Sequence, residues 1–152
     1  MAIFDIEAEL GAVATALNQQ GIEYAVCGGV ALAVHGHPRA TKDIDVIVAE
    51  TSVERTRATL RALGYTLEAA PMRFASGIEV RRVSRVESGE LFTLDLLVVT
   101  PAIEEVWRGR QVVMWRELPL GVVSRDGLIR MKRLAGRPQD LADLAALGVG
   151  DE

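Results

Sequence analysis

The stretch from Tyr24 to Val48 constrains the fold of this chain more than any other. Its sequence, YAVCGGVALAVHGHPRATKDIDVIV, predicts an apolar strand, a Gly-Gly turn, a short helix to about Val34, a polar loop and a second strand over Lys42–Val48. Strands and helices that alternate over so few residues are typical of a sheet with helices packed on its faces. We therefore expect an α/β domain built outward from this stretch.

Gly28 and Gly29 open the short helix directly after the first strand. The first backbone N–H groups of a helix have no partner within the helix, and glycine lets an anion approach the backbone closely. The pair therefore predicts a cradle for phosphate groups, and a triphosphate suits such a place. The alternative is an ordinary turn, which a Gly-Gly pair alone also marks.

Asp43 and Asp45 lie two residues apart in the strand that follows, so their side chains are expected on the same face. Two ionised carboxylates side by side repel each other, and a divalent cation relieves that repulsion. Mg²⁺ takes carboxylate and phosphate oxygens as ligands, and a pair of such ions can clamp the attacking and leaving oxygens of a phosphoryl transfer. The alternative is that both aspartates lie on the solvated face of an alternating strand.

The order of Gly28-Gly29 and then Asp43-Ile44-Asp45, separated by a helix and a loop, resembles the signature of the DNA polymerase β-like nucleotidyltransferase superfamily. With Arg39 and Thr41 before the carboxylates, the string resembles small prokaryotic AbiEii-like nucleotidyltransferases. The resemblance implies that the two aspartates hold Mg²⁺ or Mn²⁺, and that Arg39 and Thr41 lie beside them as nucleotide contacts. It also implies the reaction: a nucleoside monophosphate passes from an NTP to an acceptor hydroxyl, and pyrophosphate is released.

The chain has 152 residues, a length that suits one domain with a substantial core, and we treat 1–152 as a single domain. Its net charge of −4 gives no general attraction for nucleic acid, so an RNA contact would need a local basic patch. The single cysteine, Cys27, cannot form an internal disulfide, and we expect a buried, unreactive thiol. No signal peptide or membrane-spanning run is recognised, so we expect a cytoplasmic protein without a membrane partner.

Further elements follow from periodicity and turn residues. An apolar stripe predicts a helix from its N-cap Asp5 to near Gly21, and helical spacing recurs over Ser52–Leu63. Two strands, Ile78–Val86 and Leu91–Val99, are expected to form a hairpin. The remaining expected elements are a short strand at 65–68, a loop at 69–77, a short helix at 101–107, strands at 111–115 and 118–122, and two helices within 124–148.

Asp95 interrupts an apolar strand that reads as buried on both faces, where an unpaired charge is costly. It therefore needs a cation. In the resembled superfamily, a third acidic residue from a neighbouring strand completes the metal site and orients or deprotonates the attacking hydroxyl, and Asp95 matches that place. The alternative is an ion pair with an arginine such as Arg81 or Arg82.

The C-terminal string from Lys132 to Asp143 resembles the C-terminal motif of AbiEii-like enzymes. The resemblance implies that the helices over 124–148 close over the nucleotide, with Lys132, Arg137 and Asp140 among its contacts. Gln139 departs from the motif, since that position is commonly basic, and this puts one phosphate or acceptor contact in doubt. Taken alone, the segment also fits an amphipathic helix pair whose charges point outward.

The sequence thus predicts an α/β (α+β) nucleotidyltransferase fold, in which a small mixed sheet is flanked by helices, and a Mg-dependent enzyme. Asp43, Asp45 and Asp95 are the expected catalytic and metal-binding residues. The acceptor stays open, because tRNA ends, proteins and small molecules are all used in the wider superfamily. A rival prediction is a catalytically idle module of the same fold that works as a partner subunit, for instance beside a cognate antitoxin in a toxin–antitoxin pair. Carboxylate acid–base hydrolysis ranks last, because aromatic residues, 5% of the chain, are too few to line a sugar site.

Overall fold

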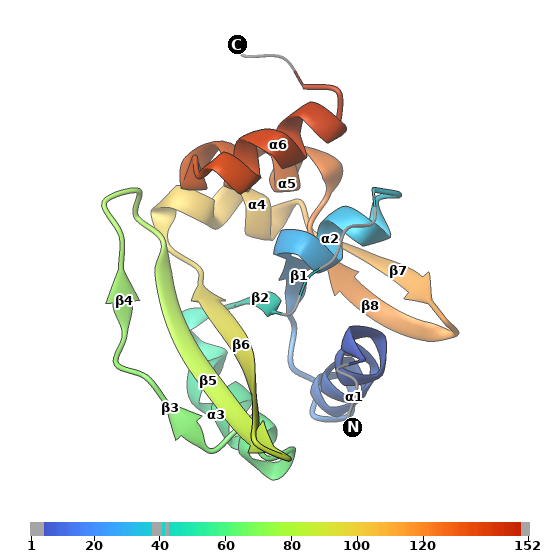
Figure 1. Cartoon of the computed structure of the whole chain (residues 1–152), viewed down its shortest axis with the longest axis vertical. Helices are drawn as coiled ribbons and strands as arrows, with labels where there is room; N and C mark the ends of the chain where they lie inside the picture. Colours follow the sequence, from blue (N-terminus) through green and yellow to red (C-terminus); the bar gives the residue numbers. More distant parts are fainter. Residues whose placement is uncertain (1–4, 38–40, 42, 150–152) are drawn as a thin grey trace.

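The computed structural model describes residues 5–37, 41 and 43–149, which form one mixed sheet of eight strands with helices on its faces (Figure 1). The strands are β1 (Ala25–Cys27), β2 (Ile44–Val48), β3 (Leu67–Glu68), β4 (Met72–Arg73), β5 (Glu79–Glu87), β6 (Glu90–Val98), β7 (Gln111–Trp115) and β8 (Leu118–Val122). The helices are α1 (Ile6–Gln19), α2 (Gly28–Val34), α3 (Val53–Ala62), α4 (Glu104–Arg108), α5 (Arg125–Ala135) and α6 (Pro138–Ala146), with short 3-10 turns η1 (Glu50–Ser52) and η2 (Pro101–Ile103).

The strands follow one another in the order β3-β5-β6-β2-β1-β8-β7, and β4 pairs with β5. β1 runs antiparallel to β2 and parallel to β8, whereas β2 runs parallel to β6. β5 and β6 form the long antiparallel hairpin that the sequence predicts. The predicted mixed sheet flanked by helices is therefore confirmed.

The alternation of side chains along β2 separates two hydrophobic cores. Ile44, Val46 and Val48 belong to the core that also contains residues of α1 and α3. Ile47 belongs to the other core, with residues of α4, α5 and α6. Figure 1 shows these two helix groups at opposite ends of the view. Since side chains two apart share a face, Asp45 points to the side of α4, α5 and α6.

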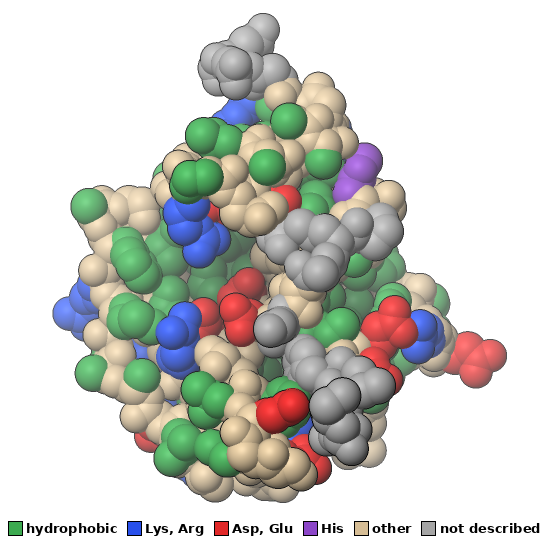
Figure 2. Space-filling view, viewed as in Figure 1, with side chains coloured by type: hydrophobic (Ala, Val, Ile, Leu, Met, Phe, Trp, Pro, Cys, Tyr) green, Lys and Arg blue, Asp and Glu red, His purple; other side chains and the backbone are tan. Residues whose placement is uncertain are grey.

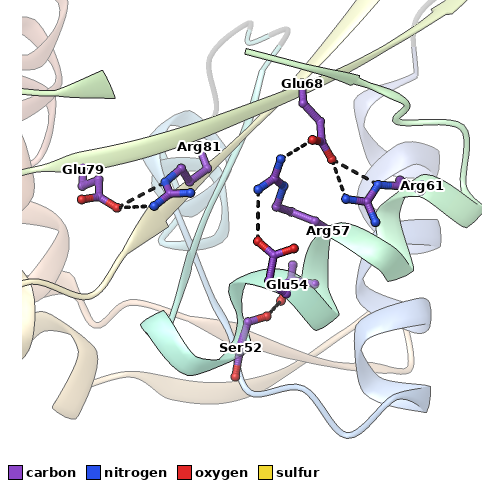
Figure 3. A network of polar contacts seen from close by, with 8 residues as sticks. Ser52, Glu54, Arg57, Arg61, Glu68, Glu79 and Arg81 are labelled. Atoms are coloured by element: carbon purple, nitrogen blue, oxygen red, sulfur yellow. Dashed lines mark hydrogen bonds and ion pairs between the residues drawn. The ribbon is translucent and has the colours of Figure 1, made fainter. Parts of the chain in front are cut away.

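On the side of the sheet that carries α1 and α3, a helix cap and a group of ion pairs stabilise the fold. The Asp5 carboxylate caps α1 by accepting hydrogen bonds from the N–H groups of Glu7 and Ala8, both at 3.1 Å, as predicted from its position. Arg57 and Arg61 of α3 both pair with Glu68 of β3, with 2.8 Å between Arg61 Nη2 and Glu68 Oε1 (Figure 3). The ion pairs join α3 to the edge strand β3, which is separated from Asp45 of β2 by β5 and β6.

Some elements differ from the expectation. β2 begins at Ile44, so Asp43 precedes the strand, and the strand expected over 65–68 is reduced to Leu67–Glu68. The loop expected over 69–77 contains the two-residue β4, in which Met72 pairs with Val80. Two residues are too few to produce a periodic pattern, because such a strand exists only through its neighbour. None of the described helices is both long and apolar enough to cross a bilayer.

Candidate active site

The register of the sheet places Asp45 and Asp95 side by side. β2 and β6 are parallel, with Asp45 opposite Asp95, and the antiparallel β5 places Arg82 opposite Asp95 in the same row. Asp43 precedes β2 and lines the same cavity as these three side chains, a space of about 710 Å³. That volume lies within the range of small-molecule and cofactor pockets. The structure therefore brings the three predicted carboxylates to one cavity.

Gly28 lies directly against the Asp45 carboxylate. A Cβ atom at position 28 would be 2.1 Å from Asp45 Oδ2, and the φ of Gly28 is +66°, in the left-handed region. Only glycine combines this backbone conformation with so close an approach. Gly28 and Gly29 both line the cavity, and no side chain of Cys27 caps the start of α2. The Gly-Gly turn therefore places backbone directly beside Asp45 in the cavity.

The charge at Asp45 is poorly compensated. Burial, followed by the negative charges of Asp95 and Asp43, raises the pKa of Asp45 from 3.8 to about 7, although Lys132 and Arg137 act in the opposite direction. Burial, followed by the negative charges of Asp45 and Asp95, also raises the pKa of the Cys27 thiol, which fits the buried, unreactive cysteine expected from the sequence. Burial and neighbouring negative charges thus disfavour the ionised form of Asp45. A site of this kind is a candidate for cation binding, because a cation would stabilise the ionised carboxylates.

Asp95 forms an ion pair with Arg82. Such a pair is the alternative to a metal site that the sequence analysis gave. Arg82 donates two hydrogen bonds to it, from Nε to Oδ1 at 2.8 Å and from Nη2 to Oδ2 at 3.1 Å. Three carboxyl groups thus lie beside one guanidinium, so the negative charge of this group exceeds the positive charge of Arg82. Among the described side chains, no three acidic, histidine or cysteine groups are gathered closely enough to hold a metal ion as they stand.

A second charged cluster joins α5 to α6. Lys132 has only 4% of its side chain exposed, and its Nζ lies 2.9 Å from Asp143 and 3.4 Å from Asp140. Both aspartates are buried, so the outward-pointing helix pair that the segment alone also fitted is wrong. α5 and α6 pack against each other on either side of Gly136, and Asp140 and Asp143 of α6 face Lys132 of α5.

Arg137 completes this cluster from the N-terminus of α6. Its backbone N–H and its Nε both donate to Asp140 Oδ2, at 3.1 and 2.7 Å, while its side chain remains 73% exposed. Burial raises the pKa of Asp140, but the hydrogen bonds and charge of Arg137 outweigh burial, and the net shift is downward. Gln139 donates to Asp143 at 3.0 Å, so the amide that departs from the motif has a role within the cluster.

The sequence of this chain matches a known protein family. A family model described as aminoglycoside-2''-adenylyltransferase matches residues 9–92, more than half of the chain. The chain belongs to this family. The matched range contains Gly28, Asp43 and Asp45 and ends before Asp95. A comparison with curated protein sequences found no match.

Two solved structures share the fold of this family member. A Thermotoga maritima protein assigned as a nucleotidyltransferase aligns with a TM-score of 0.65 at 12% identity, over 93% of this chain and 91% of that protein. ANT(2'')-Ia, crystallised in complex with adenylyl-2''-tobramycin, aligns with a TM-score of 0.61 at 14% identity, over 91% of this chain and 85% of its own. The chain therefore has a nucleotidyltransferase fold.

The remaining predicted residues divide into three groups. Thr41 lines the cavity, where its Oγ1 donates to the backbone oxygen of Asp43 at 3.3 Å. Arg39 lies outside the described residues. Lys132, Arg137, Gln139 and Asp140 line the cavity as well, although Lys132 is occupied by its two aspartates.

The sequence missed the apolar part of this cavity. Met72, Phe74 and Val80 line it beside the carboxylates. Figure 2 shows acidic side chains near the middle of this face, hydrophobic side chains along the hollow beside them, and basic side chains on either side. The pairing of Met72 with Val80 depends on the chain returning along β5, and no local pattern in 69–77 signals it.

Proposed function

We propose that this protein transfers a nucleoside monophosphate from an NTP to an acceptor hydroxyl and releases pyrophosphate. The observation that supports the proposal most is the Asp45 carboxylate packed against Gly28, in one cavity with Asp43 and Asp95, where three carboxyl groups have Arg82 as their nearest cation. A structural cluster would balance its charges, as the one around Lys132 does. The family makes ATP the first NTP to test.

The residues present fit a divalent cation. Asp43 and Asp45 would hold Mg²⁺ or Mn²⁺, because carboxylate oxygens are hard ligands and Asp45 carries a charge that its surroundings do not compensate. A bound ion would neutralise charge on the α-phosphate and on the departing pyrophosphate. Asp95, oriented by its two hydrogen bonds with Arg82, would face the acceptor hydroxyl.

The proposed reaction is an in-line displacement at the α-phosphorus. The acceptor oxygen forms a bond to that phosphorus while the bond to the bridging oxygen breaks, and pyrophosphate leaves with the electron pair. The proton of the hydroxyl passes to Asp95. Holding the hydroxyl and the α-phosphate in one cavity supplies much of the acceleration, because it removes the entropic cost of bringing them together.

The nucleotide would lie between the Gly-Gly turn and α6. Gly28 and Gly29 would present backbone N–H groups to the phosphates, and Thr41 lines the same cavity. Arg39, outside the described residues, stays a predicted phosphate contact. Arg137 is the exposed member of the C-terminal cluster, since 73% of its side chain is exposed although its Nε donates to Asp140. Lys132 and Asp140 would instead act as positioning residues, which hold α6 where Arg137 can reach a phosphate.

Calorimetry tests the binding step. Mg·ATP should bind wild-type protein, and Asp45→Asn should remove that binding while the protein remains folded. The absence of binding at saturating Mg²⁺ for ATP, GTP, CTP and UTP would reject the enzyme. Transfer of label from each α-labelled NTP into a cell extract, followed by nuclease or protease digestion, would then identify the acceptor class.

The finer assignment to an AbiEii-like enzyme of a toxin–antitoxin pair stays a prediction. If it holds, expression of the wild-type chain alone should arrest growth, and Asp45→Asn should relieve the arrest. Arrest by both proteins would instead favour the idle module, which acts by binding a partner rather than by catalysis.

A further inference from the structure

The two edges of the sheet differ in how they are protected from pairing with another chain. At one edge, the strands β3 and β4 have two residues each, and their charged residues form ion pairs, Glu68 with α3 and Arg73 with Glu79 of β5. Short strands and charges are common means of protecting an edge. At the other edge, β7 has five residues and no charged side chain, and among the described strands it pairs only with β8 (Figure 1).

Val112 and Met114 of β7 are the most exposed large hydrophobic residues in the described part of the chain, at 73% and 68%. They lie two apart in the strand, so their side chains share one face of the sheet. Val113 and Trp115 point to the other face and pack against the core that contains residues of α1. An apolar pair left in water on an edge strand gains free energy when another chain covers it.

The turn after β7 determines which backbone groups of the strand face outward. Arg116 and Glu117 both have positive φ, 50° and 66°, as in a tight type I′ turn, so Trp115 forms a hydrogen-bonded pair with the residue after the turn. Along an antiparallel strand, residues that bond the neighbouring strand alternate with residues that do not. The N–H and C=O groups of Val112 and Met114 therefore point away from β8, towards the open edge.

A second copy of β7 provides partners for these groups. When two β7 strands pair antiparallel about a two-fold axis at Val113, Val112 lies opposite Met114 of the partner subunit. Residues in such a pair exchange both N–H···O bonds, so each outward group of the two strands has a partner. The exposed apolar side chains of both copies also come together on one face of the joined sheet.

The charges that flank the strand are compatible with this arrangement. Arg110 and Arg116 would lie opposite each other across the axis, and two arginines alone would repel. Arg110 is paired with Glu23, however, and Arg116 is paired with Glu7 of α1. Each arginine thus has its own carboxylate, which offsets the repulsion.

We propose that this protein forms a two-fold symmetric dimer in which β7 pairs with β7 of a second copy and the two sheets become one. The opposite edge is protected, so pairing stops at two copies. A single strand pair buries less area than a permanent interface, so the dimer should dissociate on dilution. β8 and β1 lie between β7 and Asp45 of β2, so both active sites stay open and the dimer does not depend on the proposed reaction.

Sedimentation velocity between about 1 and about 300 μM tests the dimer, because this range covers transient interfaces. Wild-type protein should change from monomer to dimer as concentration rises. Val112→Lys/Met114→Lys should weaken dimerisation by at least about tenfold, since it places lysines opposite lysines. Leu91→Lys is the matched control, because Leu91 is 63% exposed on β6, and this variant should dimerise as wild type does. Both variants should bind Mg·ATP as wild type does.

A second pair of substitutions tests the register of the two strands. Val112→Glu/Met114→Glu should be monomeric alone but should form a heterodimer with the lysine variant, because each lysine then lies opposite a glutamate. Hydrogen exchange gives a separate measurement of the strand pairing. The amides of Val112 and Met114 should exchange at least about tenfold more slowly in the wild-type dimer than in the dilute monomer, whereas that of Val113 should not change, because it already bonds β8.

Several results would overturn the proposal. They are a wild-type monomer throughout the concentration range, an assembly larger than a dimer, a dimer that the lysine variant retains, and a dimer in which Val112 and Met114 exchange as fast as in the monomer. A monomer would leave the edge to another part of this chain, such as residues 1–4, beyond the described part. Failure of nucleotidyl transfer has a different signature, because Mg·ATP would then not bind although the dimer would still form.

Discussion

Two charged clusters line one cavity, and they differ in whether their charges balance. Around Lys132, two cations face two carboxylates, and the pKa of Asp140 is lowered because the hydrogen bonds and charge of Arg137 outweigh burial. Around Asp45, three carboxylates face one arginine, and burial together with Asp95 and Asp43 raises the pKa of Asp45 to about 7. A balanced buried cluster can serve the fold alone. An unbalanced buried cluster is better explained by a bound ligand. We therefore interpret the cluster around Lys132 as one that positions α6, and the cluster around Asp45 as one that binds a cation.

The largest expected effect comes from breaking the balanced cluster. Lys132→Ala should lower the free energy of unfolding by about 3–5 kcal/mol, because it leaves two buried carboxylates without their shared cation. Urea unfolding measures the loss. Arg130→Ala is the matched control on the same helix, since Arg130 makes only an exposed pair with Glu105 and should cost less than about 1 kcal/mol. Equal stability of the two variants would show that Lys132 is not buried against Asp140 and Asp143 in solution.

The next effect concerns the contact between the Gly-Gly turn and the unbalanced cluster. Gly28→Ala should lower stability by about 1–3 kcal/mol through backbone strain, and it should also abolish Mg·ATP binding, because the added methyl group would displace the Asp45 carboxylate. Gly21→Ala supplies the control: Gly21 has a φ of +67°, almost that of Gly28, but nothing lies within 4 Å of its added Cβ. The control should share the strain and keep nucleotide binding. Retained binding in Gly28→Ala would separate the turn from the site.

A smaller effect distinguishes the exposed member of the balanced cluster from its buried centre. Arg137→Ala should weaken Mg·ATP binding by about 1–3 kcal/mol, the value of a charge-assisted hydrogen bond, and should lower stability by about 1–2 kcal/mol, less than Lys132→Ala, because Asp140 keeps Lys132 and a backbone N–H as partners. Calorimetry and urea unfolding together resolve the two quantities. The opposite pattern, a large loss of stability with unchanged binding, would make Arg137 purely structural.

The sequence predicted the unbalanced cluster better than the balanced one, for a physical reason. Asp43, Asp45 and Asp95 are charges within or beside apolar strands, and alternation along a strand already assigns each side chain to a face. The partner of Asp95 could also be predicted, because Arg82 is one of the two arginines that the sequence offered as ion-pair alternatives to a metal site. The pairing of Lys132 with Asp140 and Asp143 depends on the angle between two helices across Gly136, which no local pattern encodes.

The absence of a local sequence pattern also explains why the apolar part of the cavity was not predicted. Met72 and Phe74 lie in a segment without periodicity, and their place beside Asp95 follows from the pairing of β4 with β5. The sheet that holds the three carboxylates was therefore predictable from the sequence, whereas the apolar lining beside them was not.

The effect at Asp45 has the most specific dependence on pH. In metal-free buffer, Asp45→Asn should raise the free energy of unfolding near pH 8, by up to about 4 kcal/mol for a pKa raised from 3.8 to about 7, because it removes a buried charge that its neighbours repel. The folded protein holds the Asp45 proton up to about pH 7, whereas the unfolded chain releases it near 3.8. Wild-type stability should therefore fall, relative to the variant, as pH rises from about 4 to about 7, and the difference should vanish near pH 4. Asp140 has the opposite sign, since its lowered pKa gives stability that is lost as pH falls below its ordinary value, and this loss is common to both proteins. Thermal unfolding of both proteins across this range measures the difference. Addition of Mg·ATP at pH 8 should reverse the order, because only the wild-type site can then bind its ligand. A variant less stable than wild type at every pH would show that Asp45 has a structural partner and does not belong to an unbalanced site.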